Sequence, residues 1–473
     1  MAHSILLNTA FASLGRLSSA ALGIVATALL TRYLGAAGFG FYSLLLAYGA
    51  LLLLAADFGL YLTLTREIAK NPQQETHILS HIISLRLALL LLVFIIGGAV
   101  LLLIPSWREV ALAFFIVALG LSFQSLSQLL MGVYQKYSVV WRVTVGDLVG
   151  RLVQIVGIVL LWPLAVGLVG MVSMFTFGAA SAFLLHQRLL PIYFPYRFKF
   201  NRPTWHQLLR VSWPLGAMLV LNAIYFRVDT LILSFFRTPA EVGHYGFAYR
   251  LIESGLFFPA MFGGLLLPRL TAAWQAGKIA HCRRLLSESL HVITIAVVLV
   301  LIFLQMTTEQ LVLLIAGPGY EAAGPLLRVV SLALASMFFG NIFGFTLVAL
   351  DKQKMLLILY AMLVVGNVLA NLATIPLWGA LAAAWTTVAT EIIATVTAGA
   401  WVYRSIGYHY NLRLLVRIAG AALATICLLL IFPPTVPVWL QLMMASVFYV
   451  ACNIILRSLT RQQLTLLLTP ASS

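Results

Sequence analysis

Long apolar stretches follow one another along almost the whole chain, from Thr9 to Leu456, with short polar segments between them. A helix of about twenty apolar residues spans the hydrocarbon core of a bilayer, where backbone groups find hydrogen-bond partners only within the helix. The pattern therefore predicts an all-α integral membrane protein with about fourteen transmembrane helices and no large soluble domain. The expected helix cores are residues 9–31, 40–64, 78–104, 109–131, 143–162, 164–185, 211–235, 246–267, 289–307, 326–349, 355–375, 380–402, 415–432 and 438–456.

Lys and Arg residues are unevenly distributed between the loops on the two sides of the predicted bundle. The side that includes both termini carries 20 of them, and the other side carries four, which are Arg32, Arg108, Arg237 and Arg328. Because positively charged loops stay in the cytoplasm, we expect a multi-pass protein of the cell (inner, cytoplasmic) membrane with both termini cytoplasmic. The start of the chain has neither a basic region nor a clear cleavage site, so we expect the first helix to remain as an anchor.

The composition argues against several other classes of protein. Hydrophobic residues make up 62% and charged residues 9%, whereas a globular domain has about 25% charged residues. The net charge of +16 would suggest a nucleic-acid partner in a soluble protein, but the cytoplasmic loops account for most of it. We therefore expect no nucleic-acid partner. Cys282, Cys427 and Cys452 lack metal-site or disulfide spacing, so we interpret them as packing residues and expect no metal.

The chain shows a weak internal repeat. Gly40-x-Tyr42 and Gly243-x-Tyr245 are 203 residues apart, and each precedes a long helix. The same offset pairs Arg66 with Arg269, and Pro163–Gly170 resembles Pro376–Gly379. Chance matches in a biased composition are the alternative. With six helices in each half, the halves would have the same orientation, which predicts a parallel repeat about the membrane normal with a central cavity.

The repeat divides the chain into four parts. We expect an N-terminal six-helix bundle (1–190), a cytoplasmic linker (191–210), a C-terminal six-helix bundle (211–403), and helices 13 and 14 with a cytoplasmic tail (404–473). The linker is basic and aromatic, as in a segment that lies at the membrane interface. A specific head-group site in the linker is the alternative.

Ten ionisable residues fall inside the predicted helices, where each costs several kcal/mol and usually faces a cavity or a partner. They are Arg16, Asp57, Arg86, Asp147, Arg151, Arg227, Asp229, Arg250, Glu253 and Glu391. Several arginines in a cavity suit an anionic substrate, because the guanidinium matches phosphate oxygens with two parallel hydrogen bonds. The acids would tune those arginines or bind coupling ions.

The spacing of these ionisable residues along their helices favours different interpretations. Asp147 and Arg151 are four residues apart on one helix face, which favours mutual neutralisation. Arg250 and Glu253, three apart, could also pair, but they lie below the outer loop where a central cavity would open. Arg16 has small polar neighbours and no nearby acid, which favours a place on the cavity wall over an inter-helix ion pair.

Four further residues have open interpretations. Arg86 either faces a cavity or extends to the cytoplasmic surface. Asp57 either binds a proton or cation or forms a hydrogen bond that packs two helices. Arg227 and Asp229 are two residues apart and point in different directions, so at least one of them needs another partner.

These stretches together resemble the polysaccharide flippases of the multidrug/oligosaccharidyl-lipid/polysaccharide (MATE-like) superfamily, over essentially the whole chain. The segments that carry the resemblance are Thr31–Tyr42, Asp57–Ala69, Arg227–Asp229, Glu241–Leu251 and Gly319–Ala323. Related lipid II flippases share an Arg-Leu-x-Glu element in helix 8, which Arg250–Glu253 matches. They also use an arginine in helix 1, for which Arg16 is the candidate.

The resemblance implies a flippase working by alternating access. It would move undecaprenyl-diphosphate-linked oligosaccharide units to the outer leaflet for O-antigen, capsule or exopolysaccharide synthesis. Arg16 and Arg250 are the leading candidates for contact with the diphosphate and glycan, and Arg86 and Arg227 are the next candidates. Glu253, Asp229 and Asp57 are candidates for ion coupling or arginine positioning.

Other functions remain as alternatives. We expect no cofactor, with coupling to an H⁺ or Na⁺ gradient left open, and membrane lipid as a partner; other polysaccharide assembly proteins are left open as partners. A lipid II flippase and a MATE-type drug/cation antiporter are the alternative transporters. The outer loops are short and nearly free of charge, which disfavours an enzyme.

Overall fold

The computed structural model describes residues 2–137, 139–192, 197–408, 410, 412–433 and 436–458. The chain divides into two compact units, Met1–Gly246 and Phe247–Ser473, which we call the first and the second unit. Every regular element in the described residues is a helix, which confirms the all-α prediction.

The first unit contains α1 (Ala2–Asp57), α2 (Leu60–Lys70), η1 (Pro72–Gln74), α3 (Glu75–Leu103), η2 (Pro105–Val110), α4 (Ala111–Lys136), α5 (Trp141–Leu161), η3 (Trp162–Leu164), α6 (Gly167–Arg188) and α7 (Arg202–Phe236). Helix α8 (Pro239–Gly255) crosses the boundary between the units. The second unit continues with α9 (Phe257–Gln275), α10 (Ile279–Met306), α11 (Thr308–Ile315), α12 (Ala323–Ala349), α13 (Gln353–Ile406), α14 (Leu412–Ile431) and α15 (Val438–Ile455).

The helices cover all fourteen expected cores. Among the described residues, eleven helical ranges are long and apolar enough to cross a membrane. Two of these ranges, Leu17–Lys70 and Gln353–Ile406, are 54 residues long, and each covers two expected cores. The remaining core lies in α7, which is not among the eleven, so the count of fourteen crossings stays a prediction.

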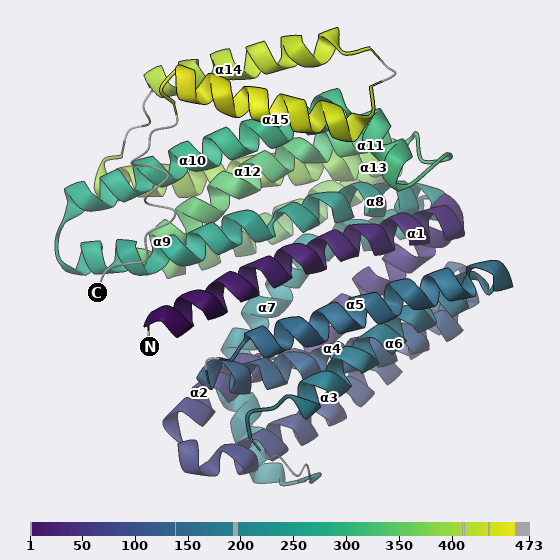
Figure 1. Cartoon of the computed structure of the whole chain (residues 1–473). Helices are drawn as coiled ribbons and strands as arrows, with labels where there is room; N and C mark the ends of the chain where they lie inside the picture. Colours follow the sequence, from purple (N-terminus) through teal and green to yellow (C-terminus); the bar gives the residue numbers. More distant parts are fainter. Residues whose placement is uncertain are drawn as a thin grey trace. The chain divides into compact units, whose positions relative to one another are not determined.

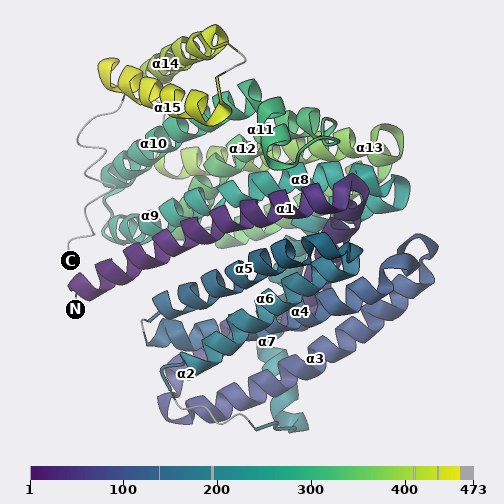
Figure 2. The same cartoon turned by 45° about the vertical axis from the view of Figure 1, so that its right-hand side comes forward.

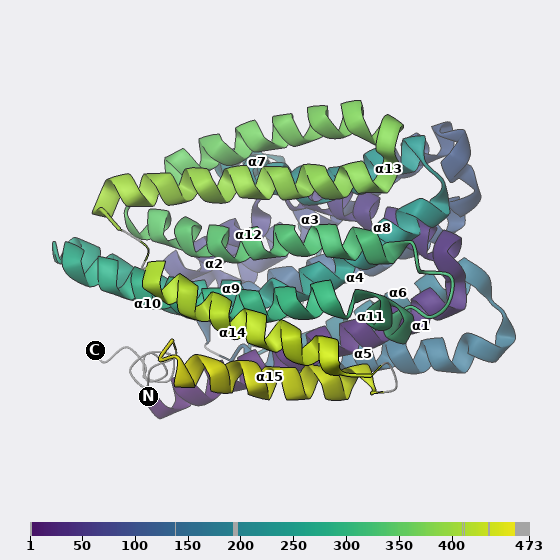
Figure 3. The ribbon, with the colours of Figure 1, turned by 90° about the horizontal axis from the view of Figure 1, so that it is seen from above.

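Both 54-residue ranges change direction at a glycine. Gly35 in α1 has φ 64°, and Gly379 in α13 has φ 60°, a region that is cheap only for a residue without a Cβ. Figure 3 shows the two limbs of α13 side by side. Gly167, in the segment that resembles Pro376–Gly379, also has a positive φ, 63°, just before α6. Both of these segments therefore contain a glycine in a conformation that favours glycine.

Close helix packing organises the first unit. Helices α3, α4, α5 and α6 lie side by side (Figures 1 and 2). A Cβ on Gly150 of α5 would lie 2.6 Å from the carbonyl oxygen of Gly178 on α6, and the reverse distance is also 2.6 Å. Small residues let membrane helices approach at backbone distance, so this glycine pair determines how closely α5 and α6 pack.

In the second unit, α14 and α15 form a pair that packs along α10 (Figures 1 and 3). The pair buries Ala421, Leu429, Ala445 and Tyr449 against Ile302 of α10. This agrees with the expectation that the last two helices are an appendage to the bundle.

Helix α7 begins at Arg202, inside the segment expected to be a linker. The Asn201 side chain accepts a hydrogen bond from the backbone N–H of Thr204 at 3.2 Å, and Pro203 occupies the first turn. A capping asparagine followed by proline is a typical helix start. The helix therefore begins nine residues before the expected apolar core.

Candidate functional site

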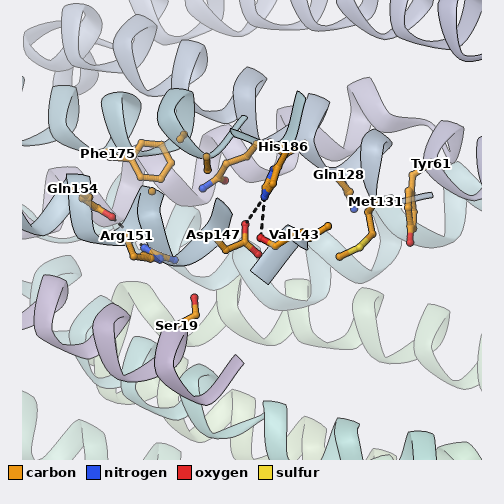
Figure 4. A pocket seen from close by; sticks show the side chains of 16 residues that line it. Ser19, Tyr61, Gln128, Met131, Val143, Asp147, Arg151, Gln154, Phe175 and His186 are labelled. Atoms are coloured by element: carbon orange, nitrogen blue, oxygen red, sulfur yellow. Dashed lines mark hydrogen bonds and ion pairs between the residues drawn. The ribbon is translucent and has the colours of Figure 1, made fainter. Parts of the chain in front are cut away.

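A polar cavity of about 450 Å³ lies within the first unit, among α1, α2, α4, α5 and α6 (Figure 4). Its polar lining residues are Ser19, Tyr61, Gln124, Ser127, Gln128, Asp147, Arg151, Gln154 and His186. All of these belong to helical ranges that are apolar enough to span a membrane. Polar side chains at such positions are costly, and they usually mark a substrate or ion path.

One side of the cavity is a row of uncharged polar groups on α4. Gln124, Ser127 and Gln128 are three and four residues apart, so they lie on one helix face. The Ser127 hydroxyl is buried and has no hydrogen-bond partner among the described residues. Amides and hydroxyls both donate and accept hydrogen bonds, so this row can bind a polar group without regard to its charge.

His186 of α6 forms a buried polar corner of the cavity. Its side chain is 1% exposed, and Nε2 lies 3.0 Å from the carbonyl oxygen of Val143. Since a carbonyl oxygen only accepts, Nε2 carries the proton and donates it. Asp147 Oδ1 is 3.7 Å from the same nitrogen, and the Asp147 side chain is 53% exposed (Figure 4).

A glycine makes room for this imidazole. A Cβ on Gly146 would lie 2.3 Å from His186 Nε2 and Cδ2, so even alanine at this position would displace the ring. On the other side, the Tyr134 hydroxyl donates to the backbone carbonyl of His186. The ring is therefore held from α5 and the backbone from α4, while His186 Nδ1 is buried without a partner among the described residues.

Arg151 lies one turn after Asp147 on α5. Its guanidinium donates to Gln154 Oε1 at 3.2 Å, three residues further along the helix. Asp147 lies against His186, and both it and Arg151 have further contacts. The cavity thus contains one acid, one arginine and one histidine on adjacent helices, and mutual neutralisation of Asp147 and Arg151 stays a prediction.

A separate ion pair lies in the interior of the first unit. Arg86 Nη1 of α3 is 2.5 Å from Asp57 Oδ1 at the end of α1, and both side chains are fully buried. Arg86 Nε donates to the Ser125 hydroxyl of α4, and Asp57 Oδ1 accepts from the Tyr61 backbone N–H at 3.4 Å. In this conformation Arg86 reaches no surface, and Asp57 joins helices as the packing interpretation expects.

Asp229 of α7 is also buried, at 3% exposure. One of its carboxylate oxygens accepts from the Tyr245 hydroxyl, and the other accepts from the backbone N–H of Thr230 at 2.7 Å. Tyr245 is the tyrosine of the second Gly-x-Tyr element, so Asp229 connects that element to α7. Arg227 is half-buried in the same helix and has contacts of its own.

The glycines of the repeated elements are in contact within the first unit. A Cβ on Gly40 would lie 1.7 Å from the carbonyl oxygen of Pro239, and a Cβ on Gly243 would lie 2.0 Å from that of Ala36. The start of α8 and the part of α1 after Gly35 therefore cross at backbone distance, which only glycine allows at these two positions.

Two of the predicted site residues belong to the second unit. Arg250 and Glu253 are half-buried on α8 in the second unit, and the side chain of Arg16 lies outside the described residues. The structure thus places Arg86 with Asp57 and Asp229 with Tyr245. Contact of the four arginines with a substrate stays a prediction.

A polar cluster in the second unit was not expected from the sequence. Asn371 donates to Asn367 at 2.9 Å, and Asn367 donates to Thr390 at 3.1 Å, all within α13 and all buried. Glu391 lies beside Thr390 in the chain and is also buried. Here and in the cavity, the missed signal is uncharged: amides spaced four residues apart inside an apolar helix. Among the described residues, no three His, Cys, Asp or Glu side chains are grouped as a metal site would require.

Comparison with known proteins shows the family of the chain and several structures with the same fold. A family model described as "Polysaccharide biosynthesis protein" matches residues 5–274. No curated protein sequence matches the chain. The structure of the lipid II flippase MurJ in an inward closed conformation is similar, with a TM-score of 0.78 and 14% identity over 94% of this chain and 98% of that one.

Two further structures share the fold. A multidrug resistance MATE family transporter of the MOP superfamily, in an inward-facing conformation, has a TM-score of 0.67 and 15% identity over 83% of this chain and 98% of its own. A MOP superfamily transporter from Pyrococcus furiosus has a TM-score of 0.58 and 14% identity over 85% and 95%. At these identities the likeness shows the fold alone.

Proposed function

The chain belongs to the family of polysaccharide biosynthesis proteins, and on that premise we propose that it is a lipid-linked oligosaccharide flippase. It moves undecaprenyl-diphosphate-linked oligosaccharide from the cytoplasmic to the outer leaflet of the cell membrane. The observation that carries the proposal is the polar cavity inside the first helical unit. A protein whose described helices are mostly apolar has little reason to gather this many amides and hydroxyls in one cavity within the membrane-spanning ranges unless a polar group passes them.

The lining suits a glycan better than a drug cation. Sugar hydroxyls donate and accept hydrogen bonds, and Gln124, Gln128 and Ser127 can do the same. Tyr61 and Phe175 supply aromatic faces in the same cavity. Among the described lining residues the only carboxylate, Asp147, is accompanied by Arg151 and His186, so this lining does not present the excess of negative charge that favours a cation.

The diphosphate requires cations, and the arginines of the helices supply them. We propose Arg250 and Arg16 as the leading candidates for contact with the diphosphate, and Arg227 and Arg86 as the next candidates. Arg86 is held by Asp57 in the present conformation and would have to exchange that partner for phosphate. Guanidinium–phosphate hydrogen bonds are charge-assisted and bidentate, which compensates for such an exchange.

The likeness to a protein named lipid II flippase supports a lipid-linked cargo of the same general form. Lipid II itself is therefore the second candidate cargo. A drug antiporter shares the fold but finds less support in the lining. Transport out of the cytoplasm, with both termini on the cytoplasmic side, completes the proposal.

The test is a complementation assay in cells that lack the gene. Wild-type protein should restore surface polysaccharide and clear accumulated lipid-linked oligosaccharide from the cytoplasmic leaflet. Arg250→Ala should reduce export about ten- to a hundredfold, since a hydrogen bond to a charged group contributes about 1.5–3 kcal/mol. Arg250→Lys should rescue only in part, because it retains the charge without the two-pronged contact.

Arg284→Ala is the matched control, because Arg284 lies on the exposed face of α10. The substrate role of Arg250 is wrong if Arg250→Ala combined with Glu253→Ala restores export at normal expression. That outcome would mean that the arginine serves only to pair with the glutamate. The flippase proposal itself is wrong if cells without the protein accumulate no lipid-linked oligosaccharide.

A further inference from the structure

We propose that His77, His81 and Lys199 form a binding site for a phosphate group near the start of α3, where the linker (191–210) lies against this helix. None of the three residues lines the polar cavity. Two sources of phosphate fit the site: the head group of a phospholipid and the diphosphate of a polyprenyl carrier. The site itself does not depend on the transported cargo, whereas assigning it to the carrier rests on the proposed function.

One face of α3 carries the two histidines. His77, His81 and Ser84 are four and three residues apart, so they follow one another along the same side of the helix. The ring centroids of His77 and His81 are 4.6 Å apart, and the ring planes are tilted by 59°. Two imidazoles at this distance can both contact one small ligand.

The linker lies against the same face. The Lys199 backbone N–H donates to the Ser84 hydroxyl at 2.9 Å, and that hydroxyl donates to the Ser80 carbonyl oxygen at 2.8 Å. Because Ser84 lies one turn after His81, this bond brings Lys199 to the histidine face. The Lys199 ammonium acts electrostatically on His81, as the neighbouring ring of His77 does.

His81 is not committed to another role in the packing. Its side chain is buried, at 6% exposure, and Nδ1 has no hydrogen-bond partner among the described residues. The bonds of the ring nitrogens decide which of them carries the proton, and here Nδ1 makes none. The ring can therefore donate a hydrogen bond to a ligand that binds beside His77, which is exposed.

The charges around the site favour an anion. Arg197 and Arg202 lie on either side of Lys199 in the chain, and the linker sequence contains no acid. Glu75, the one acid of α3, is two residues before the first histidine and points to another side of the helix. Its carboxylate is 2.7 Å from Lys136 Nζ. Imidazole and ammonium groups donate hydrogen bonds, which phosphate oxygens accept.

The site lies at the depth of lipid head groups. Helix α3 has 29 residues and is about 44 Å long, whereas the hydrocarbon core of a bilayer is about 30 Å thick. Its first turns therefore extend into the head-group region. Phe198 and Phe200, on either side of Lys199, are 59% and 67% exposed, as apolar side chains of a segment that lies in the interface are.

A divalent metal is the competing ligand for this histidine pair. Two histidines four residues apart on a helix can bind Zn²⁺, but structural zinc sites have four protein ligands and catalytic ones three. Among the described residues, no third His, Cys, Asp or Glu completes such a group. The nearby Lys199 ammonium also repels a cation, so the surroundings favour phosphate.

The decisive experiment records the ¹⁵N resonances of labelled histidine in the full chain, in maltoside micelles, which contain no phosphorus. The His77 and His81 signals are identified by their loss in His77→Gln and His81→Gln. Dioleoylphosphatidylglycerol is the first probe, and we expect it to shift both signals in a saturable way. Dioleoylglycerol has the same chains without the phosphate and should shift neither signal.

Lys199→Gln keeps the backbone bond to Ser84 and removes the charge. It should weaken binding of the phosphatidylglycerol about tenfold, the size of one hydrogen bond to a charged group, and Lys199→Arg should restore most of the affinity. Lys278→Gln is the matched control, because Lys278 is exposed before α10 in the second unit. The phosphate site is refuted if Lys199→Gln binds as tightly as Lys278→Gln, or if dioleoylglycerol shifts the signals equally.

Two further probes separate the sources and the competing ligand. Undecaprenyl diphosphate that binds more tightly than the phosphatidylglycerol assigns the site to the polyprenyl carrier, and weaker binding assigns it to the phospholipid. The proposal is wrong if Zn²⁺ shifts both histidine signals and neither phosphate compound does. Because all probes are measured without transport, failure of the export assay would count against the proposed cargo and leave this result unchanged.

Discussion

Replacing Arg86 tests how the first unit tolerates its buried charge. Arg86→Met removes the guanidinium and leaves Asp57 ionised, with both side chains at 0% exposure in the native state. Asp57 then retains the backbone N–H of Tyr61 at 3.4 Å, and Ser125 loses its donor. Breaking one side of a buried ion pair costs about 3–5 kcal/mol, so we expect a loss of that size in the free energy of unfolding.

The double variant separates the lost pair from the lost side chain. Arg86→Met with Asp57→Asn leaves no buried charge, and replacing a whole buried pair is often nearly neutral. We therefore expect the double variant to recover most of the stability lost by Arg86→Met. Denaturant titration of purified protein in detergent micelles, at equal detergent concentration, measures the three free energies.

The ion pair between Arg284 and Glu288 serves as the control, with a 2.9 Å contact and side chains 59% and 20% exposed. Exposed pairs contribute about 0.2–1 kcal/mol, so Arg284→Met should change stability by no more than that. The reasoning is refuted if Arg86→Met is as stable as Arg284→Met, or if the double variant is as unstable as Arg86→Met. A stable double variant that exports no polysaccharide would add a substrate role for Arg86.

Two shorter predictions follow from packing and charge. Gly243→Ala should lower the free energy of unfolding by about 1–3 kcal/mol, because its Cβ would lie 2.0 Å from a backbone carbonyl. Gly264→Ala should not lower it, because the Cβ added there meets nothing within 4 Å. Equal melting curves for the two variants would contradict the close crossing. Cysteines introduced at His206 and at Ser472 should react only with reagents that reach the cytoplasm, because the loops on that side carry most of the Lys and Arg. Labelling of either position from the outside would overturn the orientation or the number of crossings.

The sequence alone determined the class of fold, because the bilayer imposes its thickness on every segment separately. Each expected core is recognisable from its own apolar residues, and all of them lie in helices. Glycines that allow a turn, such as Gly35 and Gly379, are likewise local signals, since the permitted φ belongs to the residue itself.

Only the tertiary structure decides which charged side chains pair with one another. Asp57 and Arg86 are 29 residues apart, and this spacing does not indicate that they pair with each other instead of with other intramembrane charges. Their pairing depends on how α1, α3 and α4 pack, which no single segment specifies. The spacing of four residues suggests an ion pair between Asp147 and Arg151, whereas the fold also brings His186 of α6 close to Asp147.

The cavity likewise depends on the tertiary structure more than on any single segment. Its polar lining side chains come from five helices, and no helix contributes more than three of them, so the lining looks ordinary in each segment. Only their convergence makes a site. Glycines at positions 146, 150 and 178 decide that convergence, because the absence of a side chain matters only when another helix occupies the space.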